Sequence, residues 1–408
     1  MIYRTITKTV EKALKTFPAI VITGPRQSGK TTLLQSLFGK SHVYVNLENP
    51  DVRIRAREDA KLFLSQYKKP VIFDEIQYVP ELLPYIKASI DEDRTPGRWL
   101  LTGSQNFALM EGVSESLAGR AAILSLLPFS LNERLGLGKE AVNVKEITST
   151  NFFRLSKKTR DTLLDEIMLR GFYPEISSNT EVDRDLWCGS YITTYLERDI
   201  RNLTHVGNLS QFERFLKLCA IRTGQILNLS ELARDIGITV PTAKRWLSLL
   251  ETGYQVFLLY PYYKNLGKRL IKSPKLYFND PGLAAYLLGL HDEKTILNSP
   301  YFSSLFETLI VTDFWKRFLN FGQLPSLYYI RTKDGLEVDL VMEINQKLHL
   351  FEIKSAATIT RHHVSSLMRA KKDFGALVES ASIISQSLED FLISEDIYNR
   401  NWESLLSL

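Results

Sequence analysis

Apolar residues gather in short continuous runs through the first third of the chain. Four of these runs, at residues 18–23, 71–74, 98–103 and 121–129, indicate strands, because each is bounded by polar or turn-forming residues. After the first run, the segment "TTLLQSLF" at 31–38 has its apolar residues at helical spacing. The pattern predicts an α/β fold for this part of the chain.

Residues 136–205 show mostly helical patterning, and the segment 229–263 that follows predicts a winged helix. We expect Ser230 to cap a first helix, Gly237 to form the turn, and Thr239 to begin a second helix. The buried face of the second helix would carry Ala243, Trp246, Leu247 and Leu250. The apolar string "YQVFLLYPYY" at the end of the segment would supply a strand pair.

The last third contains a segment in which apolar and polar residues alternate. In "GLEVDLVMEINQKLHLFEIKSA", residues 335–356, the alternation on both sides of a polar turn predicts a β-hairpin. The tail after residue 360 indicates helices and one strand that complete the same domain.

The turn after the first strand carries a complete G-x-x-x-x-G-K-[ST] motif, "GPRQSGKT". Its glycines let backbone N–H groups turn toward phosphates, Lys30 reaches the β and γ phosphates, and the Thr31 hydroxyl ligates Mg²⁺. The helix that begins here adds the positive end of its dipole. We therefore expect ATP and Mg²⁺ as ligands, bound by Gly24, Pro25, Arg26, Gln27, Ser28, Gly29, Lys30, Thr31 and Thr32.

A second motif stands 44 residues beyond Lys30, where the apolar strand "VIFD" ends in two carboxylates, Asp74 and Glu75. In a nucleotide site Asp74 would hold Mg²⁺ together with Thr31, and Glu75 would polarise the attacking water. A solvated strand end is the alternative, and the phosphate loop nearby argues against it.

The strand after that, "RWLLTGSQN", resembles the γ-phosphate sensor of AAA+-type ATPases, with Ser104 and Asn106 as candidates. Arg120 stands before the fourth strand, where such enzymes carry an arginine finger for the neighbouring subunit's γ-phosphate. The resemblance implies that Asn106 and Arg120 join Lys30 and Glu75 in catalysis, and that the protein is a homo-oligomer. An arginine that satisfies carbonyls at a helix end is the open alternative for Arg120.

The predicted winged helix leaves polar and basic residues exposed on its second helix, where a DNA reader places its contacts. A basic run follows, with Lys264, Lys268, Arg269, Lys272 and Lys275, and no acidic residue intervenes between Glu251 and Asp280. We expect DNA contact through Thr242, Lys244, Arg245, Lys268 and Arg269. A winged helix with a purely structural role is the alternative.

The C-terminal hairpin places Asp339 near Glu352 and Lys354, and the last two share one face because they are two residues apart on a strand. Glu307, in an apolar helix, supplies a further carboxylate. Carboxylates can bind Mg²⁺, and the lysine can stabilise a pentavalent phosphate. This arrangement resembles the PD-(D/E)xK restriction-endonuclease-like core, although Val338 stands where the motif has proline. An active nuclease site and a folded core with a retired site both stay open.

Composition limits the remaining choices. With 408 residues, the chain is long enough for two or three domains, and 44% apolar with 24% charged residues is ordinary for a soluble protein. We see no run of eighteen apolar residues and no basic-then-apolar leader, so we expect a cytoplasmic protein with no membrane contact. The two cysteines, Cys188 and Cys219, are too few for a disulfide framework or a cysteine-based zinc site.

Taken in order, "ITGPRQSGKTTLL", "VIFDEIQ", "LTGSQNF", "YFNDPGLAAYLLG" and "EVDLV…FEIKS" resemble a bacterial and archaeal family of AAA-type ATPases that carry a C-terminal domain of unknown function with a nuclease-like core. The expected domains are an AAA-type P-loop ATPase domain at 1–135, a helical lid at 136–205, a winged helix at 206–285 and a restriction-endonuclease-like α/β domain at 286–408. The leading hypothesis is an ATP-hydrolysing switch or motor on or near DNA. The alternatives are an ATP-gated DNA endonuclease, and a regulator that binds DNA or protein and uses ATP only as a conformational ligand.

Overall fold

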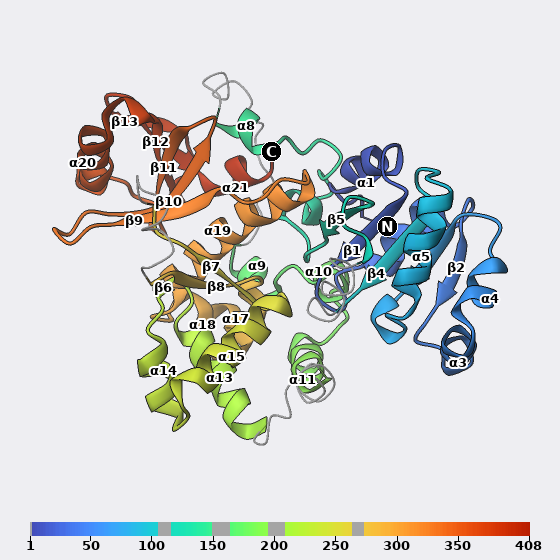
Figure 1. Ribbon diagram of the computed structural model, residues 1–408. Coiled ribbons are helices and arrows are strands. Elements are labelled where there is room, and N and C mark those ends of the chain that lie inside the picture. Colours follow the sequence, from blue (N-terminus) through green and yellow to red (C-terminus); the bar gives the residue numbers. More distant parts are fainter. Residues whose placement is uncertain (1, 105–115, 149–163, 195–208, 263–272) are drawn as a thin grey trace.

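The protein has two lobes, which Figure 1 shows with the N-terminal lobe in blue and the C-terminal part in green to red. The structure is a computed structural model that describes residues 2–104, 116–148, 164–194, 209–262 and 273–408. None of the described helices is both long enough and apolar enough to cross a membrane.

A five-stranded parallel sheet forms the core of the N-terminal lobe. In spatial order its strands are β2 (Val43–Asn46), β3 (Val71–Asp74), β4 (Trp99–Gly103), β1 (Ala19–Thr23) and β5 (Ala121–Ser125). Every position of β1, β3 and β4 is buried, which explains why these strands are continuous apolar runs in the sequence. The α/β fold predicted for this part of the chain is confirmed, and the carboxyl ends of all five strands meet at one edge.

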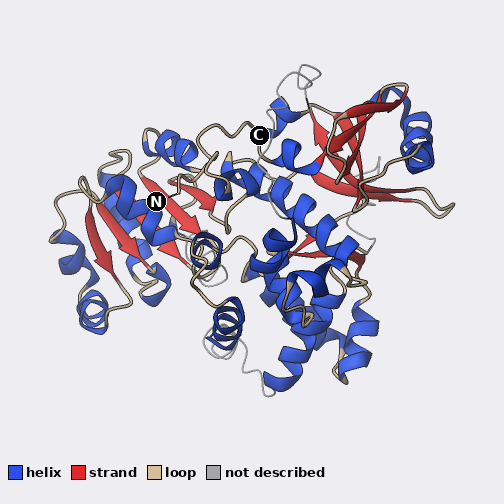
Figure 2. Cartoon of the chain, turned by 180° about the vertical axis from the view of Figure 1, so that it is seen from behind, coloured by secondary structure: helices blue, strands red, loops and turns tan. Residues whose placement is uncertain are grey.

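Helices cover both faces of this sheet (Figure 2). They are α1 (Thr7–Leu14), α2 (Lys30–Phe38), α3 (Pro50–Glu58), α4 (Ala60–Ser65) and α5 (Leu82–Glu92). Strand alternation sends Ile20 and Ile22 into the apolar cluster that includes Leu33 of α2, whereas Val21 packs into the cluster that includes Ile86 of α5. The sheet is therefore fixed from both sides, and so are the turns at its carboxyl edge.

Short helices follow β5 and lead into the second lobe: α7 (Leu131–Arg134), α8 (Val144–Ile147), α9 (Leu164–Arg170), α10 (Pro174–Ser178) and α11 (Arg184–Thr194). The end of α9 requires glycine, because Gly171 has φ +67° and a Cβ there would lie 2.1 Å from a carboxylate oxygen of Asp280. That carboxylate accepts the Phe172 N–H at 2.7 Å and so ties this region to the second lobe.

The next part combines helices with a small antiparallel sheet. It contains α13 (Leu209–Ile221), β6 (Gln225–Ile226), α14 (Leu229–Ile236), α15 (Val240–Thr252), β7 (Val256–Leu259) and β8 (Lys275–Phe278). The three strands have the order β6-β8-β7. The buried residues of α15 include the four predicted ones, among them Trp246, which packs edge-on against Phe212 and Phe215.

Two local predictions for this part are wrong. Asn228, not Ser230, caps α14, and its side chain accepts the Glu231 N–H at 3.2 Å, because the backbone leaves the extended conformation two residues earlier than we expected. The strand pair does not come from "YQVFLLYPYY" alone. That string forms β7, whose partner β8 lies beyond residue 272.

A six-stranded mixed sheet, ordered β13-β14-β12-β11-β10-β9, forms the C-terminal part. Its elements are α17 (Pro281–Leu287), α18 (Glu293–Leu297), α19 (Phe302–Asn320), β9 (Leu327–Arg331), β10 (Glu337–Ile344), β11 (Lys347–Lys354), α20 (Ser365–Phe374), β12 (Val378–Ser385), β13 (Phe391–Ser394), β14 (Ile397–Asn401) and α21 (Trp402–Leu406). The predicted hairpin is confirmed, with Leu340 opposite Phe351. The prediction of one strand after residue 360 is wrong, since β12, β13 and β14 all lie there.

The long helix α19 joins the two lobes. Its Asp313 accepts the Leu131 N–H at 2.6 Å, and its Lys316 Nζ donates to the Phe129 carbonyl at 2.9 Å. One apolar cluster continues from Phe129 through α19 to Leu406. The helix is therefore fixed by hydrogen bonds and apolar packing to the segment that follows β5.

Candidate functional site

The phosphate-loop motif folds into a tight turn between β1 and α2, and both of its glycines are required. Gly24 has φ +149°, and a Cβ at this position would lie 2.1 Å from the Leu126 carbonyl oxygen. Gly29 has φ +91° and immediately precedes α2, which begins at Lys30. The first N–H groups of α2 therefore face the carboxyl edge of the sheet, as an anion site at a helix N-terminus needs.

Two basic side chains hold this loop. The buried Lys30 donates from Nζ to the carbonyls of Gly24 at 3.0 Å and Pro25 at 2.8 Å. Arg4, which precedes α1, donates to the Ser28 carbonyl at 2.7 Å. We did not predict Arg4, because no local motif marks it and its contact joins residues 24 positions apart in the sequence.

Asp74 collects hydroxyl groups at the end of β3. Its carboxylate accepts from Thr31 at 2.9 and 3.0 Å, from Tyr44 at 2.8 Å, and from Thr102. Burial, and then Asp74 itself, raise the pKa of Tyr44, so the phenol stays protonated and donates. Thr31 and Asp74 thus present hard oxygen atoms side by side, and they fit the Mg²⁺ ion that the motif implies.

Glu75 follows β3 in a left-handed conformation, with φ +60° and ψ +49°, which is uncommon outside glycine and typical of functional sites. Its N–H donates to the Thr102 hydroxyl at 3.0 Å, and its carboxylate accepts from Ser104 at 2.9 Å and from Gln77. The contacts exist because β4 lies directly beside β3 in the sheet. Of the two sensor candidates, Ser104 contacts Glu75, and Asn106 lies outside the described residues.

A cavity of about 570 Å³ opens over the loop, within the usual size of ligand sites. Its lining comprises Arg26, Gln27, Gly29, Lys30, Thr31, Thr32 and Glu75, together with Tyr191 and Thr194 of α11. We did not predict Tyr191 at this site. Its ring packs against Trp187 and Tyr173, and the residue also lines this cavity, which only the folded chain shows.

A second cavity, of about 450 Å³, adjoins the first and shares Gly29 and Thr32 with it. The remaining lining residues are mostly apolar: Ile2, Arg4, Leu33, Phe129, Pro174 and Ser178. The two cavities together form a polar compartment beside an apolar one, separated by the first turn of α2.

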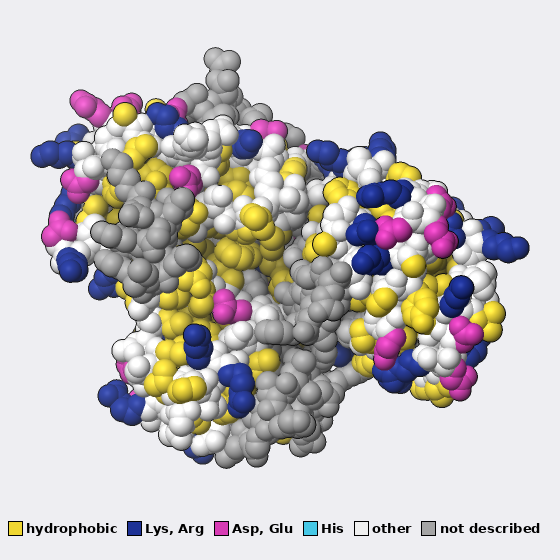
Figure 3. Space-filling view, viewed as in Figure 1, with side chains coloured by type: hydrophobic (Ala, Val, Ile, Leu, Met, Phe, Trp, Pro, Cys, Tyr) yellow, Lys and Arg dark blue, Asp and Glu magenta, His cyan; other side chains and the backbone are white. Residues whose placement is uncertain are grey.

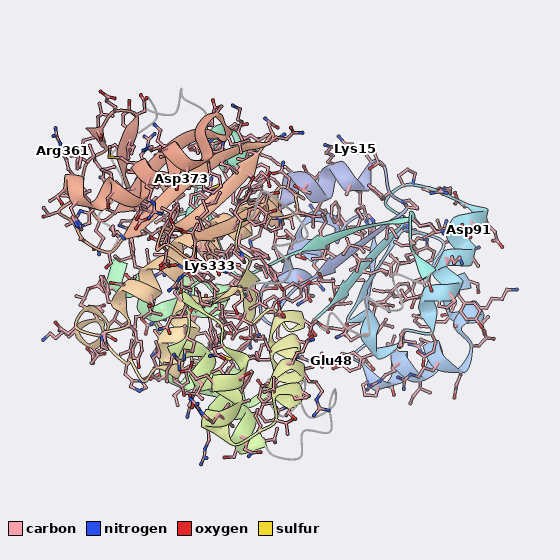
Figure 4. The ribbon with its side chains drawn as sticks, turned by 60° about the vertical axis from the view of Figure 1, so that its left-hand side comes forward. Lys15, Glu48, Asp91, Lys333, Arg361 and Asp373 are labelled. Atoms are coloured by element: carbon pink, nitrogen blue, oxygen red, sulfur yellow. The ribbon has the colours of Figure 1, made fainter. Side chains whose placement is uncertain are left out.

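Arg120 lies at the opposite edge of the sheet from the phosphate loop. It precedes β5, whereas the loop follows the carboxyl end of β1, so the five residues of β5 separate the two edges by roughly 16 Å. Its guanidinium pairs with both carboxylate oxygens of Asp91, at 2.6 and 2.9 Å, and this pairing lowers the pKa of Asp91. Asp91 projects from the side of the N-terminal lobe that faces away from the C-terminal lobe (Figure 4). Arg120 therefore cannot serve the loop of its own chain.

The residues predicted to contact DNA divide into three groups. Lys244 and Arg245 are exposed on α15 and form no ion pair within the described part of the chain. The Thr242 hydroxyl lies 2.9 Å from that of Thr239 at the start of the same helix. Lys268 and Arg269 lie outside the described residues.

The four candidate nuclease residues do converge. Glu307 comes from α19 and Asp339 from β10, while Glu352 and Lys354 come from β11. Lys354 Nζ donates to Glu352 at 2.7 Å, and Asp339 accepts the Ile353 N–H at 2.9 Å. Burial, and then Asp339, raise the pKa of Glu352 to about 7.

One expectation about this region is wrong. We assigned Lys275 to the solvent-exposed basic run, but its side chain is buried among the acidic residues of this cluster, 3.1 Å from Glu307. Among the described residues, no three histidine, cysteine, aspartate or glutamate side chains are arranged so that they could hold a metal ion.

Comparison with known proteins agrees with the nucleotide site. Residues 16–135 match the family described as "AAA domain", residues 161–294 a domain of unknown function (DUF8612), and residues 302–402 a second one (DUF4143). Among solved structures, the chain is 16% identical to the Walker-type ATPase PABY2304 of Pyrococcus abyssi, covering 70% of this chain and 96% of that one, with a TM-score of 0.43. The RuvB Holliday junction branch migration motor of Thermotoga maritima is 18% identical, covering 62% and 88%, with a TM-score of 0.29. At these scores the two likenesses support no conclusion.

Two curated relatives match at greater length. They are the uncharacterized proteins Rv2008c of Mycobacterium tuberculosis and Mb2031c of Mycobacterium bovis. Each is 32% identical over 365 residues, covering 88% of this chain and 76% of the relative. The chain therefore belongs to the same family as these mycobacterial proteins, with an AAA-type P-loop domain in its N-terminal lobe and the DUF4143 domain at its C-terminal end.

Proposed function

We propose that the protein binds and hydrolyses ATP in the larger cavity of the N-terminal lobe. The observation that carries this proposal is the contact between Thr31 of the phosphate loop and Asp74 of β3, with Glu75 directly beyond it. Binding of phosphate requires only the loop. Hydrolysis also requires a carboxylate that can activate water, and Glu75, which follows Asp74 and faces the same cavity, is in the position for that role.

Each residue of the site has a distinct role in this proposal. Lys30 exchanges its bonds to the loop carbonyls for the β and γ phosphates, while Thr31 and Asp74 would hold Mg²⁺, which neutralises charge on the phosphates. Glu75 orients a water molecule toward the γ-phosphate and accepts its proton. Ser104, through its hydrogen bond at 2.9 Å, holds the Glu75 carboxylate in place until nucleotide binds.

The apolar cavity suits the base of the nucleotide. It starts at Gly29 and Thr32, next to the loop that would bind the phosphates, and continues between Leu33, Phe129 and Pro174. A planar, largely apolar ring buries surface there, while the charged phosphates stay in the polar compartment.

The test is the substitution Glu75→Gln, which keeps the size of the side chain and removes the base. We expect phosphate release to fall about 10²-fold or more, because general-base catalysis contributes on that scale. Binding of a fluorescent ATP analogue should be retained. Glu81→Gln, an exposed carboxylate a few residues away, is the matched control. The proposal fails if the wild-type chain shows no turnover with or without DNA.

We also propose that Arg120 acts on the γ-phosphate of a neighbouring copy of the chain, which makes the active form a homo-oligomer. Arg120 lies far from the loop of its own chain, which supports action in trans. Its ion pair with Asp91 is partly exposed to solvent, so Arg120 could exchange Asp91 for a phosphate where two subunits meet. Mixing Glu75→Gln chains with Arg120→Ala chains should restore turnover that neither variant has alone, since each supplies what the other lacks. If the mixture stays as inactive as its parts, Arg120 is structural.

For the middle of the chain we propose a winged helix that contacts DNA. The element order α13-β6-α14-α15-β7-β8 and the three-stranded antiparallel sheet support the fold. Exposed Lys244 and Arg245 on α15, and the dark-blue side chains over this part in Figure 3, support phosphate contact. In the double variant Lys244→Ala/Arg245→Ala, the number of counterions released on duplex binding, measured from the salt dependence of the affinity, should fall by about two. Lys217→Ala, whose lysine pairs with Glu213 on α13, is the control.

For the C-terminal part we propose a restriction-endonuclease-like core. The succession α19-β9-β10-β11-α20-β12, with Asp339 and Glu352 on adjacent strands, supports this fold. We do not extend the proposal to DNA cleavage, because the surroundings of Lys275 give the cluster a different role.

A further inference from the structure

Lys275 of β8 occupies the centre of the C-terminal carboxylate cluster. Its Nζ atom lies 3.1 Å from a carboxylate oxygen of Glu307, 3.6 Å from one of Glu337 and 3.8 Å from one of Asp339. The side chain is only 4% exposed. A buried ammonium surrounded by three carboxylates makes the same electrostatic contacts that a divalent cation would make at that position.

The neighbouring groups complete the shell around this ammonium. The Tyr277 hydroxyl, two residues further along β8, donates to the same Glu307 oxygen at 2.5 Å. The second oxygen of Asp339 accepts a backbone N–H, and Lys354 pairs with Glu352. Oε2 of Glu352 is buried without a partner in the described chain, and burial together with Asp339 raises the pKa of this carboxyl to about 7.

Lys275 comes from the small sheet, whereas Glu337 and Asp339 come from β10 of the six-stranded sheet and Glu307 comes from α19. β8 pairs with β6 and β7, and the adjoining backbone runs along β9, where Pro261 bridges to Tyr329. The Tyr329 hydroxyl donates to the carbonyl of Ser273, two residues before β8, at 2.7 Å. The ion cluster therefore lies at the seam between the small antiparallel sheet and the six-stranded sheet, and it joins the two.

We infer that the Lys275 ammonium takes the cation position of this nuclease-like centre, so that the cluster is an ion-paired joint between two parts of the chain and not a metal-dependent nuclease. The residues of the fold are present, but they do not fit the divalent cation that the fold implies, because the Lys275 ammonium already lies among the carboxylates that would bind it. The inference does not depend on ATP hydrolysis in the N-terminal lobe.

Mn²⁺ binding tests the inference directly, in the full chain carrying Asp74→Asn so that the nucleotide site holds no metal. Electron paramagnetic resonance should detect no bound Mn²⁺ at millimolar metal, and supercoiled plasmid should stay intact with Mg²⁺ or Mn²⁺. Mn²⁺ that binds this chain and is lost on adding Glu307→Gln would overturn the inference. So would cleavage that disappears in Lys354→Ala.

Thermal unfolding tests the joint itself. Lys275→Met leaves buried carboxylates without their cation, so the unfolding midpoint should fall by on the order of 10 °C. The double variant Lys275→Met/Glu307→Gln removes one charge of each sign and should recover more than half of that loss. Lys347→Met, which breaks an exposed pair with Glu379 on the same sheet, should leave the midpoint within about 2 °C. If Lys275→Met does not fold, a folded double variant still supports the joint. A Lys275→Met midpoint equal to that of the control, or no recovery in the double variant, contradicts it.

Discussion

The two lobes each bring a lysine and two or more carboxylates to the edge of a sheet, yet they arrange them in opposite ways. In the N-terminal lobe, Lys30 bonds to carbonyls of its own loop, and Asp74 is satisfied by neutral hydroxyl groups. In the C-terminal lobe, the Lys275 ammonium lies directly between the carboxylates.

The difference determines which site can exchange ligands. The hydroxyl groups that contact Asp74 carry no charge, so a cation can bind Asp74 beside them without separating this carboxylate from an opposite charge in the part of the chain that the structure describes. In the carboxylate cluster, entry of a metal requires Lys275 to leave its three acidic partners, and the buried ammonium would then lack a counter-charge. The residue types alone thus do not show whether a site can bind a metal ion or a substrate. The groups that already pair with each charged side chain decide this.

The largest effect that separates the two sites is expected for Lys30→Ala. Removing the ammonium should lower ATP turnover about 10³-fold, because it is aimed at the charge that develops on the phosphates. The measurement is steady-state phosphate release. Lys40→Ala, at an exposed lysine just beyond α2, should behave as wild type. Equal activity of the two variants would show that the loop does not bind the transferred phosphate.

Thr102→Val sharpens the comparison within the nucleotide site. The Thr102 hydroxyl donates to Asp74 and accepts the Glu75 N–H at 3.0 Å, so its loss removes one donor from Asp74 and leaves the Glu75 N–H without this acceptor. We expect about 2 kcal/mol lower stability and about tenfold slower turnover. Denaturant titration and phosphate release measure the two effects. Thr95→Val, in an exposed turn, is the control, and a Thr102→Val chain that matches it would contradict the hydroxyl network.

The pH dependence of stability probes the carboxylate cluster. The pKa of Glu352 is raised from an ordinary 4.5 to about 7, so the folded state binds its proton more tightly than the unfolded state. The resulting stabilisation is complete below pH 4.5 and is lost as the pH rises through about 7. Glu352→Gln should remove this slope, which amounts to at most about 3 kcal/mol. Glu379→Gln, an exposed carboxylate on β12, should retain it. An unchanged slope in Glu352→Gln would assign the titration to another group.

The sequence predicted what local motifs encode. The phosphate loop, Asp74 and the sheet around them follow from consecutive residues whose spacing is dictated by one turn and one strand end. Tyr44 and Tyr191 were missed because they reach the site from β2 and α11, and only the strand order and the packing of the lobes bring them there.

Lys275 was predicted in the wrong surroundings, whereas Tyr44 and Tyr191 were not predicted at all. A run of basic residues without acidic ones between them predicts a solvent-exposed surface, because such runs are typical of surfaces that bind phosphates. The structure instead places this lysine on β8, where every position is buried and where acidic residues from α19 and β10 surround it. Its counter-charges lie more than thirty positions away, so nothing near it in the sequence could indicate them.

ATP turnover measured side by side in three chains tests the central claim most directly. In the same assay, with and without duplex DNA, the wild type should release phosphate, Asp74→Asn should lose that activity, and Glu307→Gln should keep it. That result places the chemistry in the N-terminal lobe alone. No turnover by the wild type, or turnover that survives Asp74→Asn and disappears with Glu307→Gln, would contradict the account.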